Sequence, residues 1–113
     1  MKIVEAIIQP EKLAAVKKAL REAKITKMTV TRVKGCGQQM GYMESYRGQR
    51  HDVNLLDKVS IRIGVNDGFV QPAIDAIVKA ARTDTIGDGK IFVIPLERCV
   101  RIRTGEEGGE AIG

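Results

Sequence analysis

Two strand–helix–strand patterns follow one another along this chain of 113 residues. The apolar stretch 2–8 has the length of a strand, and apolar side chains then recur every three or four residues over 11–24, the spacing of an amphipathic helix. The β-branched stretch 26–33 predicts the next strand. The same order returns with a strand, a helix and a strand expected over 59–65, 69–82 and 91–94. Few folds accommodate two such units in a short chain.

This order predicts an α+β domain of the ferredoxin-like class, βαββαβ, with a long loop between the second and third strands and both helices on one face of the sheet. We expect one domain over 1–113, because a chain of this length builds one core. A short extra strand is expected over 99–103. Apolar residues on both sides of the strand 91–94 leave the second face of the sheet uncovered. A symmetric homo-oligomer would cover it.

Composition adds three expectations. The two cysteines, Cys36 and Cys99, lack metal-ligand spacing, so reduced thiols are expected. No apolar run is long enough to span a membrane, and the first strand begins at Lys2 with no secretory signal before it; we therefore expect a cytoplasmic protein. The net charge of +5 suits nucleic acid, a small anion or a solvated surface, and does not choose among them.

The stretch 83–93, TDTIGDGKIFV, has the composition of an anion-binding loop. Gly87 and Gly89 flank Asp88, and Lys90 follows where an apolar strand begins. Glycines let backbone N–H groups approach a phosphate oxygen, and the lysine adds a mobile charge. Taken alone, such a segment is more often only a turn before a buried strand.

A second basic element lies close downstream. Residues 100–103 alternate between apolar and basic, so that in a strand Arg101 and Arg103 would leave one face while Val100 and Ile102 leave the other. Together with the glycine-rich loop, the two arginines predict a site for a polyphosphate.

About twenty residues, 37–57, separate the second predicted strand from the third, which is far more than a hairpin requires. This segment is polar and charged, with three glycines and two tyrosines. A long segment of this composition is typical of a loop that docks into a partner, and an inert connection is the alternative. The candidate target-binding residues are Tyr42, Glu44, Tyr46, Arg47, Arg50 and His51.

The combination of these segments resembles the PII-type nitrogen-regulatory signal proteins over essentially the whole chain. The resemblance is carried by YRG at 46–48, by the loop 83–93 and by RIRTGEE at 101–107, and VKGCGQQ at 33–39 and EAIIQP at 5–10 agree with it. It implies a homotrimer with nucleotide sites between neighbouring subunits. It also implies a regulatory binding protein rather than a conventional enzyme, with ATP or ADP and, together with MgATP, 2-oxoglutarate as effectors.

The resemblance also assigns roles to residues. Gln39 would offer its amide oxygen to Mg²⁺ and, with Lys58, would bind 2-oxoglutarate. The segment 82–90 would be the nucleotide loop and 99–113 the C-terminal strand and loop. The arginines would reach the nucleotide from the adjacent subunit. The implied nucleotide-binding residues are Thr29, Gly35, Gly37, Gly87, Asp88, Gly89, Lys90, Arg101 and Arg103.

For partners, the resemblance implies a target such as an ammonium transporter or a nitrogen-assimilation enzyme, bound through the long loop. Contact with a membrane would come only through a transporter, and no nucleic acid is implied. The particular target is left open.

Five positions depart from the family's common pattern. His51 stands where many members carry a tyrosine that receives a nucleotidyl group, so that modification is not expected there. Gln38 replaces a common arginine and Arg62 a common acidic residue, which leaves the balance between ATP and ADP open. Lys27 and Asp84 replace frequent glycines.

Two other functions are compatible with parts of the sequence. RNA-recognition modules share the βαββαβ order, but they stack bases on aromatic side chains of the central strands, and only Phe92 lies in a predicted strand here. A phosphotransfer enzyme with His51 as nucleophile would lack a partner network, and a loop histidine is poorly preorganised for chemistry.

Overall fold

The computed structural model describes residues 1–36, 42–46, 49–53 and 55–113, the two short middle ranges by their backbone alone. Each of the two main helices follows a turn of 3-10 helix, at Pro10–Lys12 and Asp67–Phe69. The elements are β1 (Lys2–Ile8), α1 (Leu13–Glu22), β2 (Thr29–Gly35), β3 (Tyr42–Tyr46), β4 (Gln49–Val53), β5 (Leu56–Val65), α2 (Val70–Ala81), β6 (Gly89–Pro95) and α3 (Gly109–Ile112).

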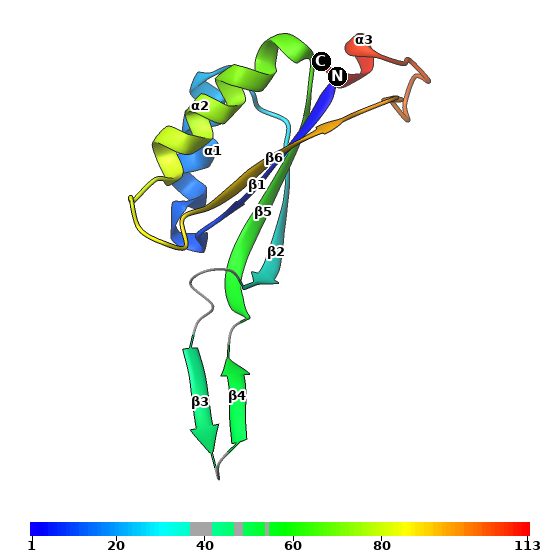
Figure 1. The fold of residues 1–113 in the computed structure, drawn as a ribbon. Coiled ribbons are helices and arrows are strands. Elements are labelled where there is room, and N and C mark those ends of the chain that lie inside the picture. The colour runs from blue at the N-terminus through cyan, green and yellow to red at the C-terminus, as the bar shows by residue number, and fades with distance from the viewer. Residues whose placement is uncertain (37–41, 47–48, 54) are drawn as a thin grey trace.

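Four of the strands form one antiparallel sheet in the order β2-β5-β1-β6. Helices α1 and α2 lie side by side against one face of this sheet (Figure 1). This is the ferredoxin-like βαββαβ arrangement, so the predicted fold class is confirmed.

The core lies between this sheet and its helices. Alternate residues of β1 and β5 point toward the helices, and the apolar positions of α1 and α2 meet them, as the 2- and 3.6-residue periods require. Each large side chain buried here contributes on the order of 2 kcal/mol. The largest fully buried side chains are Val4, Ile8, Val16, Leu20, Ile61, Ile63 and Ile77.

The opposite face of the sheet is not covered by α1 or α2. Among the described helices only the short α3 reaches it, where Ile112 lies within 3.4 Å of a Cβ built at Gly64. Strand pairing places Phe92 beside Glu5, and Glu5 beside Arg62, all on this open face. The side chain of Phe92 is 47% exposed. Ile94, two residues further along β6 and paired with Ile3, is 39% exposed on the same face. Apolar side chains of β6 therefore remain uncovered in a single chain, as the sequence predicted for the strand 91–94.

The segment 37–57 contains more regular structure than predicted. The backbones of β3 and β4 pair antiparallel as a two-stranded sheet of their own, and β5 already begins at Leu56. The predicted long loop between the second and third strands of the main sheet is confirmed; it contains the β3–β4 pair and ends at Leu56, slightly before the predicted bound. Aromatic residues spaced as in Tyr42–Tyr46 favour a strand, but the polar composition of the segment concealed this preference.

The prediction of a strand over 99–103 was wrong. It is reduced to one antiparallel bridge, between Val100 and Glu107, and residues 102–104 form a turn. The amide of Gly105, whose φ is +75°, donates a hydrogen bond of 2.7 Å to the carbonyl oxygen of Arg101. This contact folds the chain back before a strand can extend.

Two smaller expectations can be compared with the structure. Cys36 and Cys99 are both free thiols, as predicted. Within the described residues, no helix is long and apolar enough to cross a membrane.

Candidate functional site

The loop 82–90 is built around the side chain of Asp88. Its carboxylate accepts hydrogen bonds from the amides of Thr83 (2.6 Å) and Asp84 (2.9 Å) and from the Thr83 hydroxyl. The Thr83 side chain, followed by the backbone amides, holds the pKa of Asp88 below its usual range. The Asp88 carboxylate therefore holds the backbone of residues 83 and 84 in the conformation of the loop.

Positive φ angles bend the same loop. Gly87 and Gly89 have φ of +104° and +111°, and Asp84 adopts +63°, a region that aspartate tolerates better than most residues. Gly89 already belongs to β6 and pairs with Ile8 of β1. Close approach of these two backbones requires glycine at position 89.

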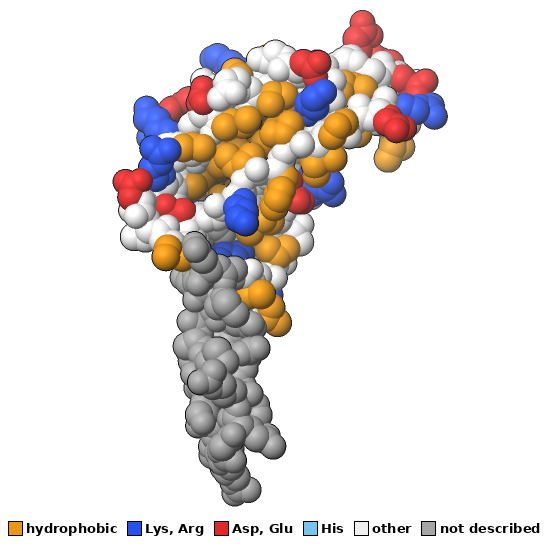
Figure 2. Space-filling model, viewed as in Figure 1, with side chains coloured by type: hydrophobic (Ala, Val, Ile, Leu, Met, Phe, Trp, Pro, Cys, Tyr) orange, Lys and Arg blue, Asp and Glu red, His pale blue; other side chains and the backbone are white. Residues whose placement is uncertain are grey.

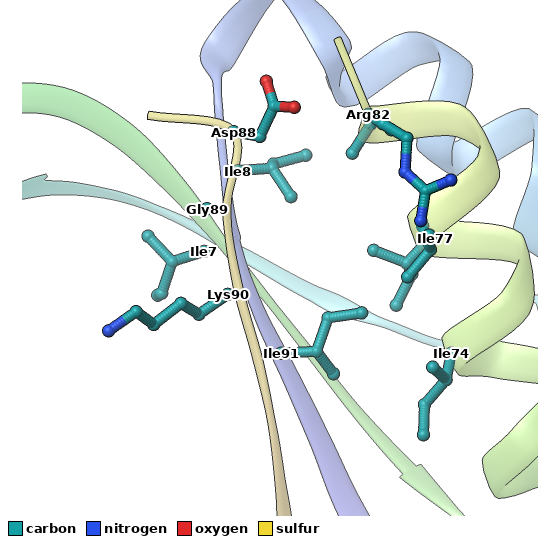
Figure 3. Close-up of a pocket in the computed structure, with 11 residues that line it drawn as sticks. Ile7, Ile8, Ile74, Ile77, Arg82, Asp88, Gly89, Lys90 and Ile91 are labelled. Atoms are coloured by element: carbon teal, nitrogen blue, oxygen red, sulfur yellow. The ribbon is translucent and has the colours of Figure 1, made fainter. Parts of the chain in front are cut away.

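Lys90 leaves this loop on the open side of the sheet. It pairs with Ile7 of β1, and Figure 3 shows the side chains of Lys90 and Ile7 pointing away from α2, whereas Ile8 and Ile91 point toward it. Lys90 is exposed. In the described part of the chain its ammonium has no hydrogen bond or ion pair, so it is available to an anion.

A hollow of about 360 Å³ lies on the other side of the same strands, between α2 and β6. Figure 2 shows apolar side chains gathered there. Its lining is mostly aliphatic, and Lys90 contributes to its rim while pointing its side chain away (Figure 3). The apolar lining does not suit a polyphosphate, so this hollow differs from the site that the sequence predicts.

Lys58 connects the 82–90 loop to the sheet. Its side chain is buried, with 8% exposure. Its ammonium donates to the side-chain oxygen of Gln9 (3.2 Å) and to the carbonyl oxygen of Gly87 (3.0 Å), which offsets the cost of burying the charge. The structure thus brings together Lys58 and Gly87, to which the family resemblance assigns different ligands.

The two candidate residues of β2 lie at opposite ends of that strand. Gly35 is next to Lys58, since a Cβ at Gly35 would contact the Lys58 Cγ at 3.8 Å. Thr29 pairs instead with Arg62 at the far end. Of these two residues, therefore, Gly35 alone lies near Lys58 and the 82–90 loop.

Arg62, one of the departures from the common pattern, is paired with a carboxylate. Its Nε lies 3.2 Å from an oxygen of Glu5, and the same oxygen accepts a hydrogen bond from Ser60 (3.3 Å). The sequence does not indicate Glu5 at this position, because the pairing depends on the register of β1 against β5.

Several candidates fall outside the described residues. They are Gly37, Gln38, Gln39 and Arg47, together with the side chains of Tyr42, Glu44, Tyr46, Arg50 and His51.

The two C-terminal arginines differ from each other. Arg101 is held by Glu106, with 3.2 Å between Nη1 and Oε1, and by the carbonyl oxygen of Glu110 at 2.7 Å. Arg103 is exposed and, among the described residues, has neither a hydrogen bond nor an ion pair. The expectation that both would leave one face of a strand was wrong, because the turn at 102–104 replaces the strand.

The C-terminal segment and the 82–90 loop lie at opposite ends of β6 (Figure 1). A strand of seven residues spans roughly 20 Å. Arg103 and Lys90 of one chain therefore lie beyond opposite ends of β6.

Fold and site together define a small α+β protein with a glycine-rich loop, 82–90, that is held by hydrogen bonds to Asp88. The buried Lys58 lies beside this loop, and the exposed Lys90 lies at its end. Comparison with known proteins is more specific. The model of the family "Nitrogen regulatory protein P-II" matches residues 1–106. The chain is 55% identical to nitrogen regulatory protein P-II of Azospirillum brasilense over 112 residues, covering 99% of this chain and all of that protein. It is 51% identical to nitrogen regulatory protein GlnK1 of Methanosarcina mazei over 114 residues, covering 99% and 97% of the two chains.

The chain belongs to the P-II family of nitrogen regulatory proteins. It is accordingly a signalling protein rather than an enzyme, and the predicted resemblance is confirmed. Family membership also decides against the RNA-binding and phosphotransfer alternatives.

Proposed function

We propose that this protein is a cytoplasmic sensor that binds ATP or ADP and, together with MgATP, 2-oxoglutarate. It acts as a homotrimer and controls an ammonium transporter or a nitrogen-assimilation enzyme through residues 37–57. The observation that carries the proposal is the contact of the Lys58 ammonium with the Gly87 carbonyl oxygen. Because these two groups are in contact, a ligand that binds Lys58 alters the 82–90 loop, and a ligand that binds the loop alters Lys58.

Phosphates are bound by the 82–90 loop and the Lys90 ammonium. The remaining positive charge comes from Arg101 and Arg103 of the adjacent protomer, since these residues lie beyond the other end of β6 in their own chain (Figure 1). Sites shared between protomers link nucleotide binding to assembly. Gly35, next to Lys58, leaves room for the ligand, and Thr29 contributes from its end of β2.

Mg²⁺ enters this proposal together with the nucleotide. In the described part of the chain, no group of three or more His, Cys, Asp or Glu side chains could hold a metal ion. Mg²⁺ commonly takes few protein ligands beside phosphate oxygens, so the Gln39 amide oxygen and the ligand's own oxygens suffice. Gln39 would hold the ion, which would supply positive charge beside the phosphates, and Lys58 would offset the charge of a 2-oxoglutarate carboxylate.

Calorimetry tests the effector sites. We expect ATP to bind the full chain, and 2-oxoglutarate to bind only when MgATP is present. Lys90→Ala should weaken ATP binding at least tenfold, whereas Lys79→Ala, an exposed lysine of α2, should not. Equal ATP affinity of Lys90→Ala and the unaltered protein would remove Lys90 from the site.

Lys58→Ala and Gln39→Ala separate the second effector from the first. Both should preserve nucleotide binding and reduce 2-oxoglutarate binding in the presence of MgATP. If 2-oxoglutarate instead binds equally well without nucleotide, the shared-magnesium arrangement is wrong.

Target binding is tested by shortening residues 42–52. The shortened protein should keep its oligomeric state and bind ATP, and it should no longer capture a purified ammonium transporter or nitrogen-assimilation enzyme. Capture by the shortened protein would refute the role of this segment.

A further inference from the structure

The Arg101 side chain is already engaged inside its own chain. Its Nη1 contacts the Glu106 carboxylate at 3.2 Å, and its Nη2 donates to the Glu110 carbonyl oxygen at 2.7 Å. The backbone supports the same geometry, since the Arg101 amide donates to the Glu106 carbonyl oxygen at 2.9 Å. Only 28% of the Arg101 side chain remains exposed. A phosphate that binds this guanidinium must therefore share its charge with the Glu106 carboxylate or displace that carboxylate.

Of the two adjacent glutamates, only Glu106 pairs with Arg101 in the described part of the chain. Glu107, the next residue, pairs with Arg98 and not with Arg101; its Oε1 lies 3.0 Å from the Arg98 Nε. Arg103 has no carboxylate partner in the described part of the chain. One glutamate of the pair 106–107 therefore neutralises a proposed phosphate-binding arginine, and the other neutralises an arginine outside the proposed site.

We propose that Glu106 is an intramolecular competitor for the polyphosphate, so that it sets the affinity of the nucleotide site. This inference rests on the proposed function, in which Arg101 contacts the nucleotide. One carboxylate carries a single negative charge, whereas terminal phosphates carry more and offer several acceptor oxygens. A ligand that reaches Arg101 therefore competes with Glu106 for the guanidinium, and it binds with lower affinity than it would bind a free guanidinium.

Phosphate binding at Arg101 also affects the segment 106–110. When a phosphate displaces Glu106 from Arg101, the Glu106 carboxylate loses its side-chain donor, one of the two side-chain contacts that hold residue 101 to the segment 106–110. Nucleotide binding thereby loosens the connection between residue 101 and the segment 106–110. A ligand that does not reach Arg101 neither meets this competition nor loosens the segment.

The test compares Glu106→Gln with Glu107→Gln in the full chain by ATP calorimetry. Glutamine preserves the size of the side chain and the backbone hydrogen bonds of the turn, and removes the charge. Glu106→Gln should bind ATP about two- to fivefold more tightly, which is the range for releasing a partly exposed ion pair. Glu107→Gln should bind ATP like the unaltered protein.

A double substitution separates competition from a structural effect. In an Arg101→Ala background, Glu106→Gln should give no gain, because no guanidinium remains to be released. Equal shifts in the two glutamine variants, weaker ATP binding by Glu106→Gln, or a gain that persists without Arg101 would each overturn the inference. If the unaltered protein binds ATP and these comparisons fail, only the inference falls; if it binds no ATP, the proposed function falls as well.

Glu106→Asp provides a second variant if Glu106→Gln does not fold. It keeps the charge and withdraws it from Arg101 by one methylene group, so a smaller gain in ATP affinity is expected. No gain, with folding intact, would contradict the competition.

Discussion

Gly89 packs so closely against Ile7 that a Cβ at position 89 would lie 1.8 Å from the Ile7 carbonyl oxygen. The φ of Gly89 is also +111°, which L side chains rarely adopt. Backbone approach between β1 and β6 therefore fixes the residue at which the proposed phosphate-binding loop enters the sheet. The glycine that suggested an anion site in the sequence is required by the fold itself.

Gly89→Ala should lower the free energy of unfolding by roughly 3 kcal/mol, since strained φ and steric overlap with β1 add up. Gly68→Ala is the matched control, because no atom lies within 4 Å of a Cβ there; its effect should be about 0.5 kcal/mol or less. Urea unfolding at one protein concentration measures both. A Gly89→Ala protein as stable as the control would show that the strands separate easily at this point.

Asp88 should make loop stability depend on pH. Hydrogen bonds from Thr83 lower the pKa of Asp88 in the folded protein. Its ionised carboxylate therefore stabilises the fold above the ordinary aspartate pKa, near 3.9, and this contribution disappears as the pH falls through the lower folded pKa. Carboxyl NMR titration should place the Asp88 midpoint below the ordinary value.

Two substitutions check the origin of that shift. Thr83→Val removes one donor and should move the Asp88 pKa back toward its ordinary value. Asp88→Asn should unfold at a lower temperature than the unaltered protein at pH 7, and the difference should shrink toward pH 3. A difference in unfolding temperature that does not change with pH would mean that the carboxylate charge has no part in bracing the loop.

How far the sequence predicts this molecule depends on the range of the interaction. The alternation over 59–65 predicts the inward-facing residues of β5 because burial of one sheet face imposes a two-residue period. The same reasoning failed at 100–103, where the pattern also alternates. There the Gly105 hydrogen bond to Arg101 folds the chain back, a contact that hydrophobic periodicity does not reveal.

The candidate site shows a similar division. Gly87, Gly89 and Lys90 are neighbours in sequence, and their grouping could be predicted. Burial of Lys58 against Gly87 depends on how β5 packs beside the loop, and it was not predicted; only the 2-oxoglutarate role of Lys58 was expected, through family resemblance. The glutamates after Arg101 were a usable signal that went unread, since carboxylates a few residues from an arginine in a turn can reach it.

Arg62→Glu should destabilise the protein by about 1 kcal/mol, since it replaces the ion pair with Glu5 by two facing carboxylates on adjacent strands. Arg62→Gln removes the pair without repulsion and should cost less. Urea unfolding at low salt should resolve the two, and near 1 M salt, where the screening length is about 3 Å, they should converge. Identical free energies of unfolding for both variants at low salt would mean that the Glu5 charge does not interact measurably with a charge at position 62.

Phe92 provides a test of self-association through the open face of the sheet. Phe92→Glu removes about 1 kcal/mol of burial per protomer and adds the larger cost of burying a carboxylate, so the oligomer should dissociate at concentrations where the unaltered protein stays assembled. Phe69→Glu is the control, because Phe69 is similarly exposed, 43% against 47%, but lies in the 3-10 helix before α2. Sedimentation velocity distinguishes the two. If both variants sediment like the unaltered protein, the oligomer is held together elsewhere, and the proposed convergence of Lys90 with the arginines of a neighbouring protomer would lose its structural basis.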